Sequence, residues 1–141
     1  MNELLKDFPV IITVPILWAD MDAFQHVNNT VYFKHFEHGR IAYFDRIQTD
    51  LVKKSSGIGP ILAETSCRFR IPLTYPDTVS IGTRVTLVES DRFMMEYRVV
   101  SHNHQKIAAE GSGKIVAFDY RENKKTNLPD AIKQAIESLE N

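Results

Sequence analysis

The chain has 141 residues, enough for one domain that buries about two-thirds of its unfolded surface. Apolar residues make up 43% and charged residues 25%, and a net charge of −1 provides no electrostatic attraction to nucleic acid or an anionic membrane. The sequence contains no run of about 18 apolar residues, and its charged first residues lack the apolar segment of a signal peptide. We therefore expect a cytoplasmic protein with neither a membrane nor a nucleic-acid partner.

The first part of the chain predicts a strand followed by a long helix. Residues 8–18 are β-branched and apolar, and Pro15 cannot donate a ladder hydrogen bond, so the strand belongs at a sheet edge or carries a bulge. Apolar residues at 29–51 recur at spacings of three, four and seven, which predicts one uninterrupted helix. Glu37 falls inside this apolar stripe, where a carboxylate needs a partner, and Gly39 suggests the close approach of another backbone.

After a predicted loop at residues 53–60 the apolar period changes from 3.6 to 2, which indicates consecutive strands joined by short turns. We expect these strands at residues 61–73, 79–87, 93–99 and 106–120. The last of them carries small residues such as Gly111 on one face, where the long helix can pack closely. A short amphipathic helix is expected at about 129–140.

This order of elements predicts an α+β fold. Strands joined by turns of two to five residues pair antiparallel, so we expect a five-stranded antiparallel sheet wrapped around the long helix. We expect residues 1–141 to form one domain with its core at about 8–120. The second face and the edges of the sheet need cover, so a homo-oligomer is the simplest expectation.

Polar side chains crowd the connection between the first strand and the helix, at residues 18–33. Asn28 or Asn29 can cap the helix, and the partial positive charge and unpaired N–H groups of a helix start can hold a developing negative oxygen. Asp20 and Asp22 place carboxylates beside this helix start. By residue type alone either one is a candidate for catalysis, and either one can instead cap a turn.

A resemblance to a known family rests on one motif: Asp20-Met21-Asp22, then His26-Val27-Asn28-Asn29, then Tyr32 and Glu37. These residues resemble the motif of the 4-hydroxybenzoyl-CoA thioesterase family of hot-dog-fold acyl-CoA thioesterases, closest to the bacterial branch that acts on fatty or other acyl-CoA esters. The likeness in the order of elements covers roughly residues 8–120. It implies a hot-dog fold, an acyl-CoA substrate in a groove at a dimer interface, and a homodimer or homotetramer.

Carried over by position, the resemblance makes Asp22 the catalytic carboxylate and the start of the helix the group that polarises the thioester carbonyl. Asp22 would attack the carbonyl or activate a water. Many family members have glycine where this chain has Gln25. The residues expected to bind substrate are His26, Asn28, Asn29, Tyr32 and Glu37.

Each of these substrate-binding assignments has a structural alternative. His26 can be a hydrogen-bonding loop residue, one of the two asparagines a helix cap, Tyr32 a core residue, and Glu37 the partner of Arg40 or of a strand arginine. The basic residues that could meet CoA phosphates, or simply face solvent from a strand, are Arg68, Arg70, Arg84 and Lys114.

The sequence predicts no metal or other cofactor. The single cysteine, Cys67, rules out an intrachain disulfide and a cysteine-based zinc site, and His35 and His38 have no third ligand at a convincing spacing.

We therefore expect an acyl-CoA thioesterase that releases a free acid and CoA. One alternative is an enoyl-thioester hydratase or dehydratase on the same fold, because such enzymes also pair an aspartate with a histidine near the helix start. Another is a non-catalytic acyl-thioester binding protein, for which Gln25 leaves room. The sequence leaves open the acyl group and the choice between CoA and an acyl carrier protein.

Overall fold

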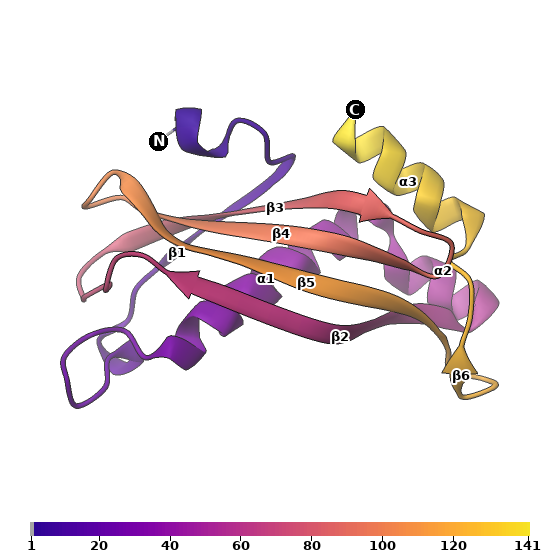
Figure 1. The fold of residues 1–141 in the computed structure, drawn as a ribbon, viewed down its shortest axis with the longest axis horizontal. Coiled ribbons are helices and arrows are strands. Elements are labelled where there is room, and N and C mark those ends of the chain that lie inside the picture. Colours follow the sequence, from indigo (N-terminus) through magenta and orange to yellow (C-terminus); the bar gives the residue numbers. More distant parts are fainter. Residues whose placement is uncertain (1) are drawn as a thin grey trace.

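A curled sheet surrounds one long helix in the computed structural model, which describes residues 2–141 (Figure 1). Five strands follow the order β1-β3-β4-β5-β2 with every neighbouring pair antiparallel, and the short β6 pairs with β5. The strands are β1 (Val10–Pro15), β2 (Ile58–Phe69), β3 (Thr78–Val88), β4 (Arg92–Ser101), β5 (Lys106–Asp119) and β6 (Lys124–Lys125).

Three α-helices in the described residues accompany the sheet: α1 (Asn29–Ile47), α2 (Thr49–Ser56) and α3 (Asp130–Glu140); Asn2–Leu5 and Trp18–Asp20 form short 3₁₀ helices. Helix α1 lies in the curl of the sheet, which is the predicted hot-dog fold (Figure 1). Strand β1 is an edge strand with Pro15 as its last residue, so the prediction made from this proline is confirmed. No helix among the described residues is both long enough and apolar enough to cross a bilayer.

Close packing between α1 and the sheet depends on two glycines. A Cβ on Gly111 would overlap the ring of Phe36, which stacks on Tyr97 with its centroid 4.8 Å away. A Cβ on Gly39 would overlap the hydroxyl of Thr83 on β3. The predicted contact between the helix and the small residues of β5 is confirmed, while Gly39 meets a strand side chain and not another backbone.

The prediction of one uninterrupted helix over residues 29–51 is wrong. Gln48 adopts the left-handed conformation (φ 59°), which ends α1 and turns the chain into α2. Leu51 is consequently 62% exposed instead of lying in the apolar stripe. Residues 53–56, expected in a loop, are helical, and β2 begins and ends earlier than predicted.

The placement of Glu37 within a buried stripe is also wrong, because its side chain is exposed. Its apolar neighbours in the pattern, Phe33 and Phe44, are only half-buried at the margin of the helix. Arg40, one expected partner of Glu37, instead donates a hydrogen bond to the hydroxyl of Tyr97 at 3.1 Å.

His35 is the unusual residue on the buried side of α1. It is only 5% exposed, and neither ring nitrogen has a hydrogen-bond partner among the described residues. Burial lowers its pKa below the ordinary value of 6.5, and the nearby Asp20 carboxylate offsets part of this effect. His38 and Lys34 lower the pKa further. The folded protein therefore favours a neutral imidazole at this position.

We expect His35→Leu to raise the free energy of unfolding by about 1 kcal/mol at neutral pH, because it removes two unpartnered buried polar atoms without opening a cavity. The unfolded chain binds a proton more readily than the folded one, so native stability falls as the pH drops below about 6.5. Urea unfolding between pH 7 and about pH 5 should show a shallower pH dependence for His35→Leu. The exposed His38→Gln provides the control, and an unchanged slope in His35→Leu would contradict the assignment.

Helix α3 closes the end of the fold that lies away from the start of α1. The Glu140 carboxylate accepts hydrogen bonds from the Tyr43 hydroxyl at 2.6 Å and from the Val85 backbone N–H at 2.9 Å. Burial and this carboxylate raise the pKa of Tyr43. The N–H of Val85 is free for this bond because the pairing of β3 with β1 ends at Thr83.

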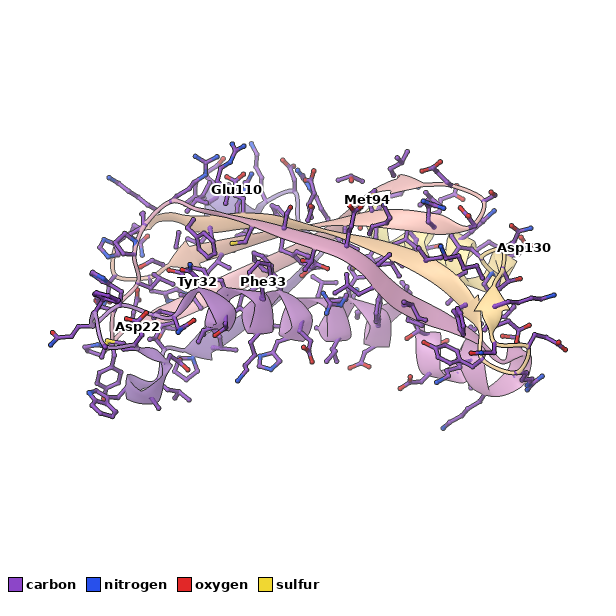
Figure 2. All side chains as sticks on the ribbon, turned by 60° about the horizontal axis from the view of Figure 1, so that its bottom comes forward. Asp22, Tyr32, Phe33, Met94, Glu110 and Asp130 are labelled. Atoms are coloured by element: carbon purple, nitrogen blue, oxygen red, sulfur yellow. The ribbon has the colours of Figure 1, made fainter. Side chains whose placement is uncertain are left out.

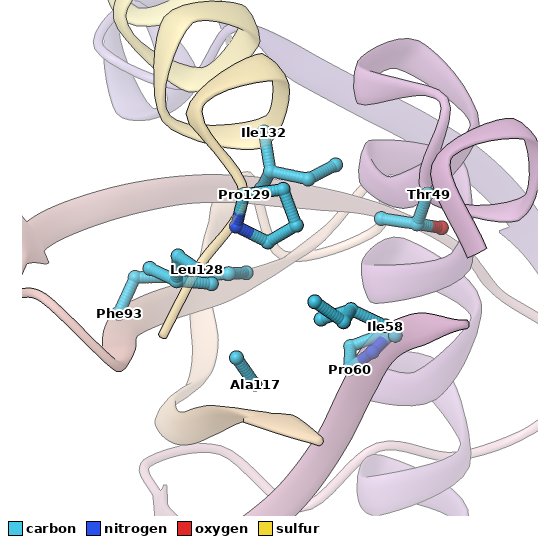
Figure 3. A pocket seen from close by; sticks show the side chains of 9 residues that line it. Thr49, Ile58, Pro60, Phe93, Ala117, Leu128, Pro129 and Ile132 are labelled. Carbon is cyan, nitrogen blue, oxygen red and sulfur yellow. The ribbon is translucent and has the colours of Figure 1, made fainter. Parts of the chain in front are cut away.

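An apolar cavity of about 20 Å³ lies beneath the start of α3 (Figure 3). Ile58, Phe93, Leu128 and Ile132 are among its lining residues, and Thr49 carries its one side-chain polar group. This volume is close to that of a single water molecule. Because it offers neither room nor chemistry for a substrate, we interpret it as imperfect packing.

Candidate active site

A tight loop holds Asp22 at the left-hand end of the molecule in Figure 2. Met21 and Val27 pair across the base of this loop. The Asp22 N–H donates to the His26 carbonyl at 3.0 Å, and Asp22 Oδ1 accepts from the Phe24 N–H at 2.9 Å. No described residue donates to Oδ2. The carboxylate is therefore fixed through one oxygen and leaves the other available.

Gln25 completes the loop in the left-handed conformation, with φ 65°. This is the position at which many members of the resembling family have glycine. The backbone geometry that favours glycine is retained here although the side chain is present, so the local structure carries strain.

We expect Gln25→Gly to raise the free energy of unfolding by about 0.5–1 kcal/mol, since relief of the left-handed strain outweighs the greater freedom of glycine in the unfolded chain. Gln25→Ala is the matched control because alanine meets the same steric restriction. Urea unfolding of both variants measures the effect. Equal stability of the two would show that the strain at this residue is negligible.

The start of α1 presents an unpaired backbone donor. Asn28 caps the helix, its Oδ1 accepting from the N–H and from the hydroxyl of Thr30, each at 2.9 Å, while its carbonyl accepts from the Val31 N–H. The N–H of Asn29 finds no acceptor among the described residues. Together with the helix dipole, this group forms a site for negative charge.

The structure separates the two aspartates of the motif. Asp20 Oδ2 accepts from the Leu17 N–H at 2.8 Å, and the Asp20 carbonyl accepts from the Asn28 N–H at 2.9 Å. Asp20 thus holds the loop against the helix start. Asp22 is the carboxylate that faces solvent.

Two pockets meet at Asp22. The helix-start pocket, of about 310 Å³, is lined by Asp22, Phe24, His26, Val27, Asn29, Tyr32, Phe69, Arg70, Ile71 and Pro72. The tryptophan pocket, of about 480 Å³, is lined by Trp18, Met21, Asp22, Gln25, Thr74 and Tyr75. Asp22 and Tyr32 lie at the same end of α1 (Figure 2). A substrate can therefore pass over the carboxylate with one part in each pocket.

Residues 16–136 match the thioesterase-like superfamily. The chain belongs to this superfamily. A thioesterase from Thermus thermophilus, solved with coenzyme A and zinc, is 30% identical, with a TM-score of 0.84 over 96% of each chain. The PA2801 protein from Pseudomonas aeruginosa is also 30% identical, with a TM-score of 0.80 over 92% of this chain and 98% of its own. Protein THEM6 from Danio rerio is 27% identical over 94 residues, 67% of this chain and 46% of that protein, so the chain spans about half the length of the curated relatives it matches.

In this thioesterase-like chain, three of the predicted substrate-binding residues line a pocket with Asp22: His26, Asn29 and Tyr32. The other two, Asn28 and Glu37, line neither pocket. The Asn28 side chain is occupied as the helix cap, and Glu37 is exposed further along α1.

Tyr32 connects α1 by hydrogen bonds to the segment that forms the opposite wall of the helix-start pocket. Its hydroxyl donates to the Ile71 carbonyl at 3.2 Å and accepts from the Leu73 N–H at 3.2 Å. The Leu73 carbonyl in turn accepts from the Val27 N–H at 2.8 Å. Burial raises the pKa of Tyr32, so the hydroxyl stays protonated. Because Tyr32 is only 2% exposed and its hydroxyl is bonded twice, it offers a ligand no free polar group.

The four candidate cations lie in different surroundings. Two pair with carboxylates across neighbouring strands: Arg84 Nη2 with Glu96 Oε1 at 2.7 Å, and Lys114 Nζ with Glu64 Oε2 at 2.8 Å. Arg70 lines the helix-start pocket, with its Nε 3.4 Å from Glu110. Arg68 is on β2 outside that pocket. Arg70 is therefore the cation placed to meet a ligand at Asp22.

Pocket walls were the part of the site that the sequence did not reveal. Phe69 ends β2 and Tyr75 lies in the segment after it, both far from the motif in sequence, and Trp18 lies two residues before the motif but had no predicted role. No spacing rule connects these aromatic residues.

Burial raises the pKa of the Cys67 thiol to about 11, which makes it a poor nucleophile at neutral pH.

Proposed function

We propose that this chain is an acyl-CoA thioesterase that uses Asp22 as its catalytic carboxylate. One observation supports the proposal most strongly: Asp22, whose carboxylate has one oxygen free of donors among the described residues, and Asn29, whose backbone N–H is unpaired among them, line the same pocket. Thioester hydrolysis needs these two groups together, a base or nucleophile and a donor for the developing oxyanion.

In the proposed reaction the thioester carbonyl oxygen accepts a hydrogen bond from the Asn29 N–H. Asp22 either removes a proton from a water that adds to the carbonyl carbon, or adds to that carbon itself to give a mixed anhydride that water then hydrolyses. The C–S bond breaks and its electron pair leaves with sulfur, which takes up a proton. The products are a carboxylic acid and a free thiol.

Coenzyme A is the proposed carrier of the acyl group. The Thermus thermophilus relative was solved with coenzyme A, and Arg70 lines the pocket at Asp22, where it suits a phosphate-bearing ligand. The motif from Asp20 to Glu37 is the basis for proposing the 4-hydroxybenzoyl-CoA thioesterase branch within the superfamily.

We further propose that the working form is a homo-oligomer, at least a dimer. Strand β2 pairs only with β5, so its other edge carries a row of unpaired backbone groups along a 12-residue strand. A second copy paired along this edge would cover it. The proposed contribution of Glu37 to substrate binding requires such a second subunit, because Glu37 does not reach the pockets of its own chain.

Release of free thiol from a panel of acyl-CoA esters tests the proposed function. We expect turnover on at least one ester, with equimolar acid and thiol. Loss of enoyl absorbance from an enoyl-CoA without thiol release would favour the hydratase alternative. Binding of esters without turnover of any of them would favour a non-catalytic binding protein.

A further inference from the structure

The two pockets that meet at Asp22 differ in charge. The helix-start pocket contains Arg70, and its edge continues to a group of cations on the sheet, because the Glu110 carboxylate that faces Arg70 also lies 4.0 Å from Arg98. Arg68 pairs in register with Glu110 across β2 and β5. Arg70 is thus the cationic side chain in the lining of the helix-start pocket, and Arg68, Arg98 and Glu110 line a separate pocket on the sheet.

The tryptophan pocket has no cationic side chain among its lining residues. Its walls are the indole of Trp18, the thioether of Met21 and the phenol ring of Tyr75, with Gln25 and Thr74 as polar members. The Tyr75 N–H contacts the Met21 sulfur at 3.5 Å, which joins two of these walls. The pocket is therefore uncharged apart from Asp22 itself.

Trp18 is 72% exposed and Tyr75 47% exposed, so two large aromatic side chains leave much of their apolar surface in water beside a reactive carboxylate. Covering apolar surface is favourable in proportion to the area removed from water. An apolar ligand group in this pocket gains that energy, whereas a phosphate group gains nothing from these walls.

We propose that the tryptophan pocket binds the acyl group of the thioester, and that the carrier leaves the site through the helix-start pocket past Arg70. This inference rests on the proposed thioesterase function and adds the substrate class: esters of compact apolar acids, aromatic or branched, that fit between the rings of Trp18 and Tyr75. Trp18 and Tyr75 then set the acyl specificity, and Arg70 contributes to recognition of the carrier.

Trp18 is the single tryptophan of the chain, so its fluorescence tests the assignment without any need for catalysis. The probes are the non-hydrolysable thioethers S-benzyl-CoA and S-isobutyl-CoA, compared with free CoA. We expect both thioethers to shift Trp18 emission to the blue, as the indole leaves water, and free CoA to leave it unchanged. An equal shift with free CoA would place the carrier in this pocket and overturn the assignment. A thioether that binds by calorimetry without shifting the emission would also overturn it.

Variant kinetics provide the second test. We expect Trp18→Ala and Tyr75→Ala to lower kcat/KM at least about tenfold for benzoyl-CoA while acetyl-CoA changes little, because only the larger group fills the pocket. Leu87 on β3 is also an exposed apolar residue, and Leu87→Ala is the matched control. It should leave kcat/KM for both esters unchanged. Arg70→Gln should raise KM for the CoA ester but not for the corresponding phosphate-free N-acetylcysteamine ester.

The outcomes separate this inference from the proposed function. If Trp18→Ala still hydrolyses esters but loses kcat/KM equally for all acyl groups, the assignment of the acyl pocket is refuted. The proposed thioesterase function would be unaffected. An oligomeric state altered by Trp18→Ala would identify the aromatic surface as a contact between copies instead. Absence of both turnover and thioether binding would remove the proposed function, and this inference with it.

Discussion

Asp22→Asn should lower kcat for thiol release about 10³-fold while the protein keeps its fold. The amide oxygen of asparagine can still accept the Phe24 N–H, so the loop geometry that depends on Asp22 Oδ1 is preserved. The amide can neither remove a proton from water nor attack a carbonyl. The change therefore removes the proposed chemistry without removing the structural hydrogen bond.

Asp20→Asn is the matched control for this experiment. It neutralises a carboxylate two residues away but keeps the acceptor for the Leu17 N–H. We expect its kcat to stay within about tenfold of the native value. Comparable turnover by Asp22→Asn and the native enzyme would exclude Asp22 from the mechanism, and comparable losses in both variants would indicate a general electrostatic effect.

Gly39→Ala should lower the free energy of unfolding by about 2 kcal/mol, because the new methyl group would overlap the hydroxyl of the fully buried Thr83. This cost outweighs the gain of about 1 kcal/mol that alanine brings to a helix interior. Urea unfolding followed by circular dichroism measures the change. Gly59→Ala is the control, since its methyl group would chiefly meet the flexible Lys53 side chain, and it should cost less than 1 kcal/mol.

Thr83→Ala tests whether overlap with the Thr83 hydroxyl causes the loss of stability expected for Gly39→Ala. The Thr83 hydroxyl has no hydrogen-bond partner among the described residues, so its removal alone should change stability by about 1 kcal/mol or less. Combined with Gly39→Ala it should restore native stability, with a coupling energy of about 2 kcal/mol. Additive effects of the two substitutions would mean that α1 can move away from β3 at little cost.

The sequence was sufficient to predict most of the sheet and the local geometry around Asp22. Alternation at period 2 locates β3, β4 and β5 closely, because each has one face in the core and short turns fix the neighbours. The loop at Asp22 and the helix start at Asn29 could also be predicted from the sequence, because both depend on hydrogen bonds within a few residues of the chain.

Features that depend on the rest of the fold could not be predicted from the sequence. The break at Gln48 requires a left-handed residue that no spacing of apolar side chains reveals. The exposure of Glu37 follows from which side of α1 the curled sheet encloses, and the apolar pattern was ambiguous at its margin. One wall of each pocket comes from the segment after β2, which is bonded to the Tyr32 hydroxyl and the Val27 N–H.

The position of β2 in the sheet also has a consequence for the folding order of the chain. It precedes β3 in sequence but pairs with β5, so it joins the sheet only after the β3-β4-β5 meander is available, and it closes a larger loop than any hairpin of that meander. Phe69, its last residue, and Arg70 after it are walls of the helix-start pocket. The side of the site assigned to the carrier is therefore expected to form only after the β3-β4-β5 meander has folded.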